Sequence, residues 1–139
     1  MRHLGQMEPF FVIDVDVPRD LVLIRMGGFF GPEAIAQFTK ARNEAHARLQ
    51  CAPNAHMTLT DVTDMSIQSQ EMVTSFQTLL ANPTHRSRKL AFVHASTLAR
   101  MQLQRAAASR NVAYFRNAEE AEAWLFGEQE QVEPRSANG

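Results

Sequence analysis

The acidic and hydroxyl side chains that could do chemistry in this sequence gather in one short segment, residues 56–69 (HMTLTDVTDMSIQS). They are Asp61, Thr63, Asp64, Ser66 and Ser69. Two carboxylates three residues apart could hold a magnesium ion or act as an acid–base pair. Alternatively, Asp64 and Ser66 cap the turn and the helix after it, because such side chains accept hydrogen bonds from free backbone N–H groups. The sequence offers no third ligand or nearby base, so we favour capping and predict no metal site.

The histidines and the single cysteine show no spacing that is typical of a metal or nucleophile site. The histidines are His3, His46, His56, His85 and His94. His94 ends a predicted strand and could face a ligand, although a hydrogen-bonded structural role is the favoured interpretation. Cys51 follows a predicted helix and is interpreted as a buried or idle thiol.

Neither the glycines nor the basic residues form a recognised phosphate-binding motif. Gly27, Gly28 and Gly31 match neither the dinucleotide fingerprint nor the Walker loop, so they are assigned to a sharp turn. The basic run Arg86, Arg88 and Lys89 could hold an anion, but before a strand it is interpreted as a solvated collar. Net charge is −1 and the pI is about 6.5, which argues against a nucleic-acid partner. We therefore predict no cofactor.

Length and composition predict one soluble domain. The chain has 139 residues, of which 45% are hydrophobic and 21% charged, and this balance is typical of a globular protein. No run approaches the roughly 18 apolar residues that a membrane helix needs. One cysteine cannot form an internal disulfide, and the first residues lack the apolar region of a signal peptide. These features predict a cytoplasmic protein.

Hydrophobic periodicity predicts five strands and four helices in the order β-β-α-β-α-β-α-β-α. The predicted strands cover residues 9–17, 21–26, 57–62, 90–94 and 112–115, and the first two form an antiparallel hairpin. The predicted helices cover 32–50, 69–81, 96–110 and 117–126. Their alternation indicates a mixed, mainly parallel five-stranded sheet with four helices. We expect one domain over residues 9–126, with flexible tails at 1–8 and 127–139.

The element order, read with particular residues, resembles the STAS fold and most of all its SpoIIAA-like branch of STAS/SEC14-type proteins. The matching stretches are LVLIRMGGFFGPEAI, LTDVTDMS, KLAFVHAS and VAYFRNAEEAEAWL, which span residues 10–125. The resemblance implies a small fold that recognises proteins or small ligands, usually without catalysis.

The resemblance also draws attention to phosphorylation. Sporulation-type members of the fold are phosphorylated on a serine of an Asp-Ser-Ser-Gly loop at the start of the helix after the central strand. Here that place reads Ile67-Gln68-Ser69-Gln70-Glu71, so the signature is absent. Ser66 and Ser69 remain the only hydroxyl candidates beside it, and control by phosphorylation is placed in doubt.

The predicted helix at 69–81 has a face that could dock a partner. Between Asp64 and His85 the only formal charge is Glu71, and the non-core side carries Gln70, Thr74 and Gln77. Interface centres are depleted of charge, so such a face is easy to desolvate. The preferred hypothesis is a non-enzymatic regulatory or interaction domain that docks a protein, or a second copy, through the loop 61–69 and this helix.

Two other hypotheses remain open. Nine phenylalanines and seven methionines, with Phe29, Phe30, Met65 and Met72 near the presumed open edge, would suit a module that binds a small apolar or lipid-like ligand. A hydrolase or transferase built on Asp61, Asp64 and His94 ranks third, because the sequence shows no activated nucleophile.

Overall fold

The structure, a computed structural model, describes residues 7–107 and 111–127. Within those ranges it contains one five-stranded sheet and four α-helices. The strands are β1 (Phe10–Asp16), β2 (Leu21–Gly28), β3 (Met57–Met65), β4 (Lys89–Val93) and β5 (Val112–Phe115). The helices are α1 (Pro32–His46), α2 (Gln70–Leu80), α3 (Thr97–Ala106) and α4 (Ala118–Phe126).

The strands lie in the sheet in the order in which they occur along the chain, so β3 is the central strand. β1 pairs antiparallel with β2, and the other three pairs are parallel. This arrangement confirms the predicted mixed α/β fold, its element order and its opening hairpin.

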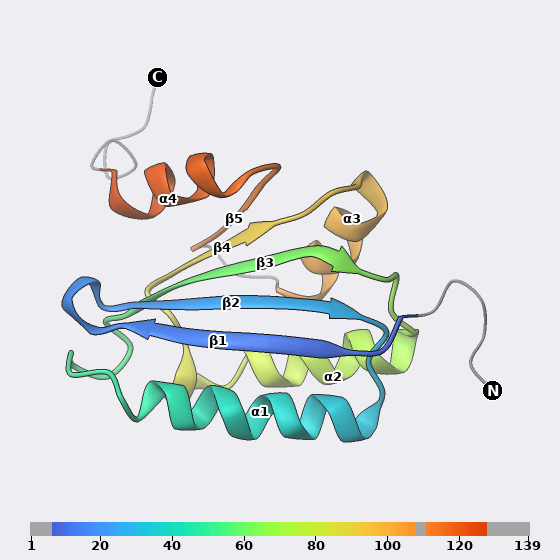
Figure 1. The fold of residues 1–139 in the computed structure, drawn as a ribbon, viewed down its shortest axis with the longest axis horizontal. Coiled ribbons are helices and arrows are strands. Elements are labelled where there is room, and N and C mark those ends of the chain that lie inside the picture. The colour runs from blue at the N-terminus through green and yellow to red at the C-terminus, as the bar shows by residue number, and fades with distance from the viewer. Residues whose placement is uncertain (1–6, 108–110, 128–139) are drawn as a thin grey trace.

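The strand order decides which helices share a face of the sheet. α1, α2 and α3 each connect one parallel strand to the next, and every step advances in the same direction. Because such crossovers are almost always right-handed, the three helices must lie on one side of the sheet. α4 follows the last strand and lies on the opposite side (Figure 1). We call the side with three helices the inner face and the side with α4 the outer face.

Each face has its own hydrophobic core, as the period-two alternation of the strands requires. On the inner face, Val22, Ile24 and Met26 of β2 pack with side chains of all three covering helices. On the outer face, Leu21, Met57, Leu59, Ala91 and Val93 pack against Ala121, Trp124 and Leu125 of α4.

Lys89 fixes α4 to the outer face and contradicts its expected place in a solvated collar. Its side chain is buried, and its Nζ donates to the backbone oxygens of Trp124 at 2.6 Å and Leu125 at 3.3 Å. The ammonium also lies 4.4 Å from the centroid of the Trp124 ring. The free carbonyls at the C-terminus of a helix attract a cation, and this attraction draws Lys89 inward.

Several predicted caps are confirmed. Ser96 Oγ accepts from Ala99 N at 3.0 Å and Asn117 Oδ1 from Glu120 N at 2.8 Å, while Pro32 occupies the first turn of α1. α1 ends at His46 rather than near residue 50, because Arg48 N and Leu49 N bond to carbonyls three residues back and tighten the chain into a turn.

The N-terminal arm is better anchored than expected, and most of both predicted tails lies outside the described residues. Met7 O accepts from Phe29 N at 3.1 Å, so the chain is already held at residue 7. No helix in the described ranges is long and apolar enough to cross a membrane.

Candidate functional site

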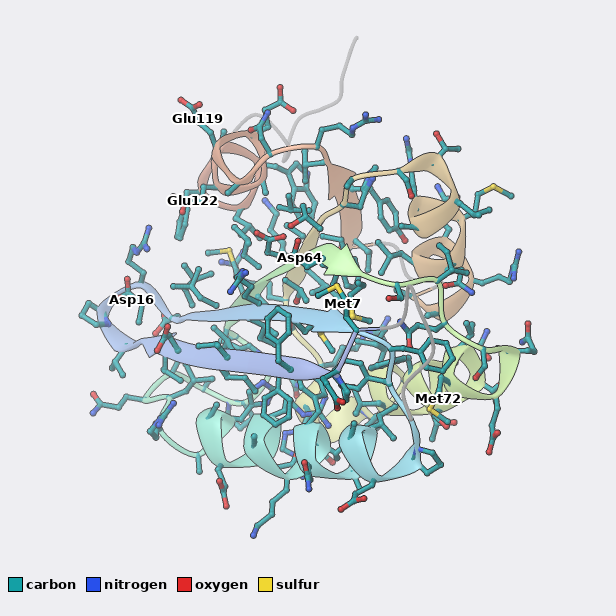
Figure 2. All side chains as sticks on the ribbon, turned by 45° about the vertical axis from the view of Figure 1, so that its right-hand side comes forward. Met7, Asp16, Asp64, Met72, Glu119 and Glu122 are labelled. Atoms are coloured by element: carbon teal, nitrogen blue, oxygen red, sulfur yellow. The ribbon has the colours of Figure 1, made fainter. Side chains whose placement is uncertain are left out.

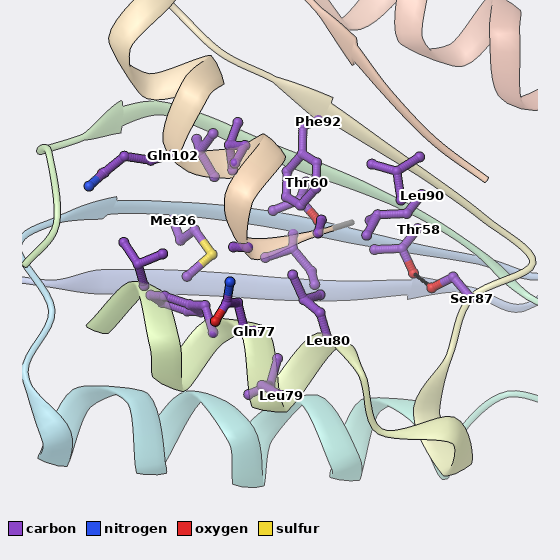
Figure 3. A pocket seen from close by; sticks show the side chains of 18 of the residues that line it. Met26, Thr58, Thr60, Gln77, Leu79, Leu80, Ser87, Leu90, Phe92 and Gln102 are labelled. Carbon is purple, nitrogen blue, oxygen red and sulfur yellow. Dashed lines mark hydrogen bonds between the residues drawn. The ribbon is translucent and has the colours of Figure 1, made fainter. Parts of the chain in front are cut away.

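A cavity of about 440 Å³ lies between the inner face of the sheet and the helices that cover it. Figure 3 shows side chains from three sides of it: Thr60 and Phe92 from the sheet, Gln77 and Leu80 from α2, and Gln102 from α3. We call this space the central cavity. Its apolar lining includes Ile24, Phe38, Val62, Phe76, Leu80, Leu90, Phe92 and Leu103.

The cavity exists because the residues that meet at its centre are small. β3 directs Thr58 and Thr60 at the inner face, where its neighbour β2 carries Val22 and Ile24. α3 contributes Ala99 and Ala106 to the lining. Interiors pack to near-crystal density only when side-chain volumes match the space between elements, so short side chains on facing elements leave a void.

A group of polar side chains lies at one end of the central cavity. His46 Nδ1 and His85 Nδ1 are 3.0 Å apart, and the rings of His46 and His56 are 4.4 Å apart between centroids. A chain of hydrogen bonds continues from His56 Nε2 to Ser87 Oγ at 3.2 Å. From Ser87 Oγ it goes on to Thr58 Oγ1 at 2.7 Å, the bond drawn in Figure 3. We call His46, His56 and His85 the histidine cluster.

Burial keeps the histidine cluster neutral. Desolvation is the largest cause in each case, and it lowers the pKa of His46 to about 3 and lowers the pKa of His56 and His85 as well. The nearby guanidinium of Arg42 lowers all three further, since a second positive charge beside a cation is unfavourable. At neutral pH the cluster therefore offers imidazole donors and acceptors, while the charge at this end belongs to arginine.

The opposite end of the central cavity is closed by two glutamines. Gln68 Oε1 accepts from Phe30 N at 2.9 Å and its Nε2 donates to Gly28 O at 3.0 Å, which joins the start of α2 to the end of β2. The backbone of Gln68 exchanges two hydrogen bonds with the Gln102 side chain on α3, at 2.8 and 2.9 Å. We call these four bonds the glutamine clasp.

The acidic residues predicted for the site lie on the outer face, away from the cavity. β3 runs three residues further than predicted, so Asp61, Thr63 and Asp64 belong to the strand and not to a loop. A bulge places two residues of β3 opposite Met26, so Asp61 and Asp64 face the same way. Asp64, at the end of β3 in Figure 2, is 3.0 Å from Arg25 Nη2.

The prediction that Asp64 and Ser66 cap the turn and the helix after it is therefore wrong. Asp61 Oδ1 accepts from Thr63 N and Oγ1, Asp64 forms the ion pair, and the cap of α2 is Ser69, whose Oγ accepts from Met72 N at 3.2 Å. The bulge is the reason, because it continues strand pairing through the residues that would have formed the turn.

The remaining predicted site residues divide between the cavity and the surface. Ser66 and Gln77 line the central cavity, and Gln77 Nε2 also donates to Arg105 O at 2.7 Å. Gln70 and Thr74 are exposed on α2, as expected for a docking face. The geometry does not support the hydrolase hypothesis, because His94 Nδ1 is buried without a hydrogen-bond partner among the described residues, so neither Asp61 nor Asp64 orients it.

Sequence reasoning missed the histidine cluster, Arg42 and Gln68. His46, His56 and His85 are separated by up to 39 residues, so no spacing rule could join them. The burial of Arg42 could have been predicted from its spacing, because it is four residues from Phe38 and three from Ala45 and shares their buried stripe on α1. In the described ranges, no group of three histidine, cysteine or acidic side chains could hold a metal ion.

Comparison with known proteins adds no identification. No family model matches the chain, and no curated protein matches it. The STAS resemblance therefore stays a prediction.

We expect Gln68→Ala to lower the free energy of unfolding by about 1–3 kcal/mol, because it leaves Phe30 N buried without its partner, while Gly28 O keeps the bond from Ser66 N at 3.2 Å. Urea unfolding followed by circular dichroism measures the change. Gln70→Ala is the matched control, since that side chain is exposed. Equal losses in the two variants would contradict a special role for the glutamine clasp.

Acid should destabilise the fold through the histidine cluster. A histidine whose folded pKa lies below its ordinary value of about 6.5 binds more protons when unfolded, so its contribution is complete above that pH and is lost as pH falls toward the folded pKa. Each such histidine costs at most about 1.4 kcal/mol per pH unit. Unfolding free energies of His46→Gln should therefore fall less steeply than wild type between pH 6 and 4. Identical slopes would show that His46 is not buried neutral.

Proposed function

We propose that this protein binds a small, mainly apolar ligand in the central cavity. The observation that carries the proposal is the cavity itself, which has about 440 Å³ of space and a mostly hydrophobic lining. Small-molecule sites are typically about 300–1,000 Å³, apolar, and supplied with a few polar groups that fix orientation. At about 30 Å³ for a water-sized group, the space has room for about fifteen such groups.

The polar groups are placed where they could orient a ligand. His46 and His85 of the histidine cluster line one end with Thr58 and Ser87, and Ser66 with Gln102 lines the other. Thr60 and Gln77 add further polar groups to a mainly hydrophobic surface. A molecule with a long apolar body and one polar end would satisfy this distribution.

A binding role without catalysis agrees in kind with what the STAS/SEC14 resemblance implies. Thr58, Ser87 and His56 form hydrogen bonds mainly with one another, so they serve to hold the wall of the cavity. The proposal needs no cofactor.

Filling the cavity should weaken binding without harming the fold. Thr60→Leu adds apolar volume at the centre of the cavity, and we expect the neutral dye Nile red to bind about tenfold more weakly, which is about 1.4 kcal/mol. Thr63→Leu is the control, because Thr63 is exposed on the same strand. Fluorescence titration measures both. Dye binding that is equal in wild type and Thr60→Leu would contradict the proposal.

A second candidate function is docking of a protein partner beside the start of α2, and it rests on three exposed apolar side chains. Ile67 is 42% exposed in the loop before α2, and Leu98 and Met101 on α3 are 57% and 46% exposed. The bonds between Gln68 and Gln102 bring that loop to α3. Neighbouring exposed apolar side chains are typical of interaction sites.

Self-association is the form of docking that can be tested with the purified chain. If this patch joins two copies, Leu98→Lys with Met101→Lys should shift the mass measured by sedimentation equilibrium from dimer to monomer. Thr74→Lys with Thr78→Lys, on the exposed side of α2, tests whether the interface extends along that helix. A monomeric wild type at all concentrations would exclude the second copy as the partner.

A further inference from the structure

Arg42 presents a buried positive charge to the central cavity. Its side chain belongs to the inward stripe of α1, lines the cavity and is only 6% exposed. Among the described residues its side-chain hydrogen-bond partner is neutral, since Nε donates to Asn43 Oδ1 at 3.0 Å. No carboxylate of the described residues forms an ion pair with it. Burial accordingly lowers its pKa, with no acidic neighbour to offset the effect.

A buried cation without a counter-ion is costly, so its presence calls for an explanation. The Arg42 guanidinium lies close enough to the histidine cluster to lower the pKa of all three imidazoles. Those imidazoles are neutral, so they do not repel the guanidinium strongly, but they do not balance its charge either. None of the described side chains balances this charge, so an anion in the cavity would do so.

The charges around the central cavity have one sign. Among the described residues that line it, the ionisable side chains are Arg42, Arg86 and Arg105 with His46 and His85, and none is aspartate or glutamate. A low-dielectric cleft lined by one sign of charge attracts the opposite charge. The lining therefore favours an anion over a neutral or cationic guest.

We propose that the ligand of the central cavity is a monocarboxylic acid with an apolar body, whose carboxylate binds Arg42 beside the histidine cluster while its body fills the hydrophobic remainder. This inference rests on the proposed function and names the class of ligand. Arginine binds carboxylates through two parallel N–H donors, and the hydroxyls of Thr58 and Ser87 line the same end of the cavity.

The observations favour a carboxylate over a larger or more highly charged head group. One buried guanidinium balances one negative charge, and the histidine cluster adds donors but no further charge at neutral pH. A phosphate would bring up to two negative charges and three acceptor oxygens. Space for about fifteen water-sized groups suits a carboxylate with a medium-length chain or a small aromatic body.

The test compares two ligands of equal length that differ only in the head group. Decanoate and 1-decanol, kept below the concentrations at which they aggregate, compete with Nile red for the wild-type protein. We expect decanoate to bind at least about tenfold more tightly than decanol. Equal affinities would overturn the carboxylate inference and leave cavity binding standing. Failure of both to displace the dye would overturn the proposed function together with the inference.

Variants then locate the head group. Arg42→Met should remove the preference for decanoate over decanol, while Arg42→Lys should keep part of the preference because it keeps the charge. Arg105→Met is the matched control, since Arg105 lines the cavity but is exposed. Thermal melts show that each variant is folded. A preference that survives Arg42→Met, or is lost in Arg105→Met, would overturn the assignment to Arg42.

Discussion

The handedness of the crossovers is the constraint on which the rest of the structure depends. Four parallel strands follow one another across the sheet, so right-handed connections place α1, α2 and α3 on one face and leave only α4 for the other. The two faces consequently differ. One helix closes tightly on the outer face, where Lys89 bonds its last carbonyls, whereas three helices must share the inner face.

Three helices over one face leave space wherever their side chains and those of the sheet are short. Thr58 and Thr60 on the central strand and Ala99 and Ala106 on α3 line the central cavity, and their short side chains leave part of this space unfilled. The glutamine clasp keeps it from collapsing, because it ties the loop before α2 to both the end of β2 and α3. Stability and cavity are thus properties of the same few contacts.

The chemistry of the cavity follows from what α1 contributes to it. Ordinary amphipathic helices bury apolar stripes, yet α1 buries Arg42 between Phe38 and Ala45. His46, one turn further on, meets His56 and His85, which arrive from the start of β3 and the turn before β4. This cation among neutral imidazoles at the end of an apolar space is the basis of the proposed binding of an amphipathic anion, and that proposal is independent of the exposed patch around Ile67.

The sequence by itself determined the elements, their order and the mixed α/β fold, because hydrophobic periodicity, Ser96, Asn117 and Pro32 act within one or two turns of chain. It placed Asp61 and Asp64 in a loop, since the bulge that keeps them in β3 is set by pairing with β2. It could not bring together the histidine cluster, since His46 and His56 lie at the two ends of the segment between α1 and β3 and His85 lies beyond β3. Nor could it show that short side chains of β3 and α3 line one cavity. Only the tertiary structure decided these, because a cavity and a charge environment arise between elements and not within them.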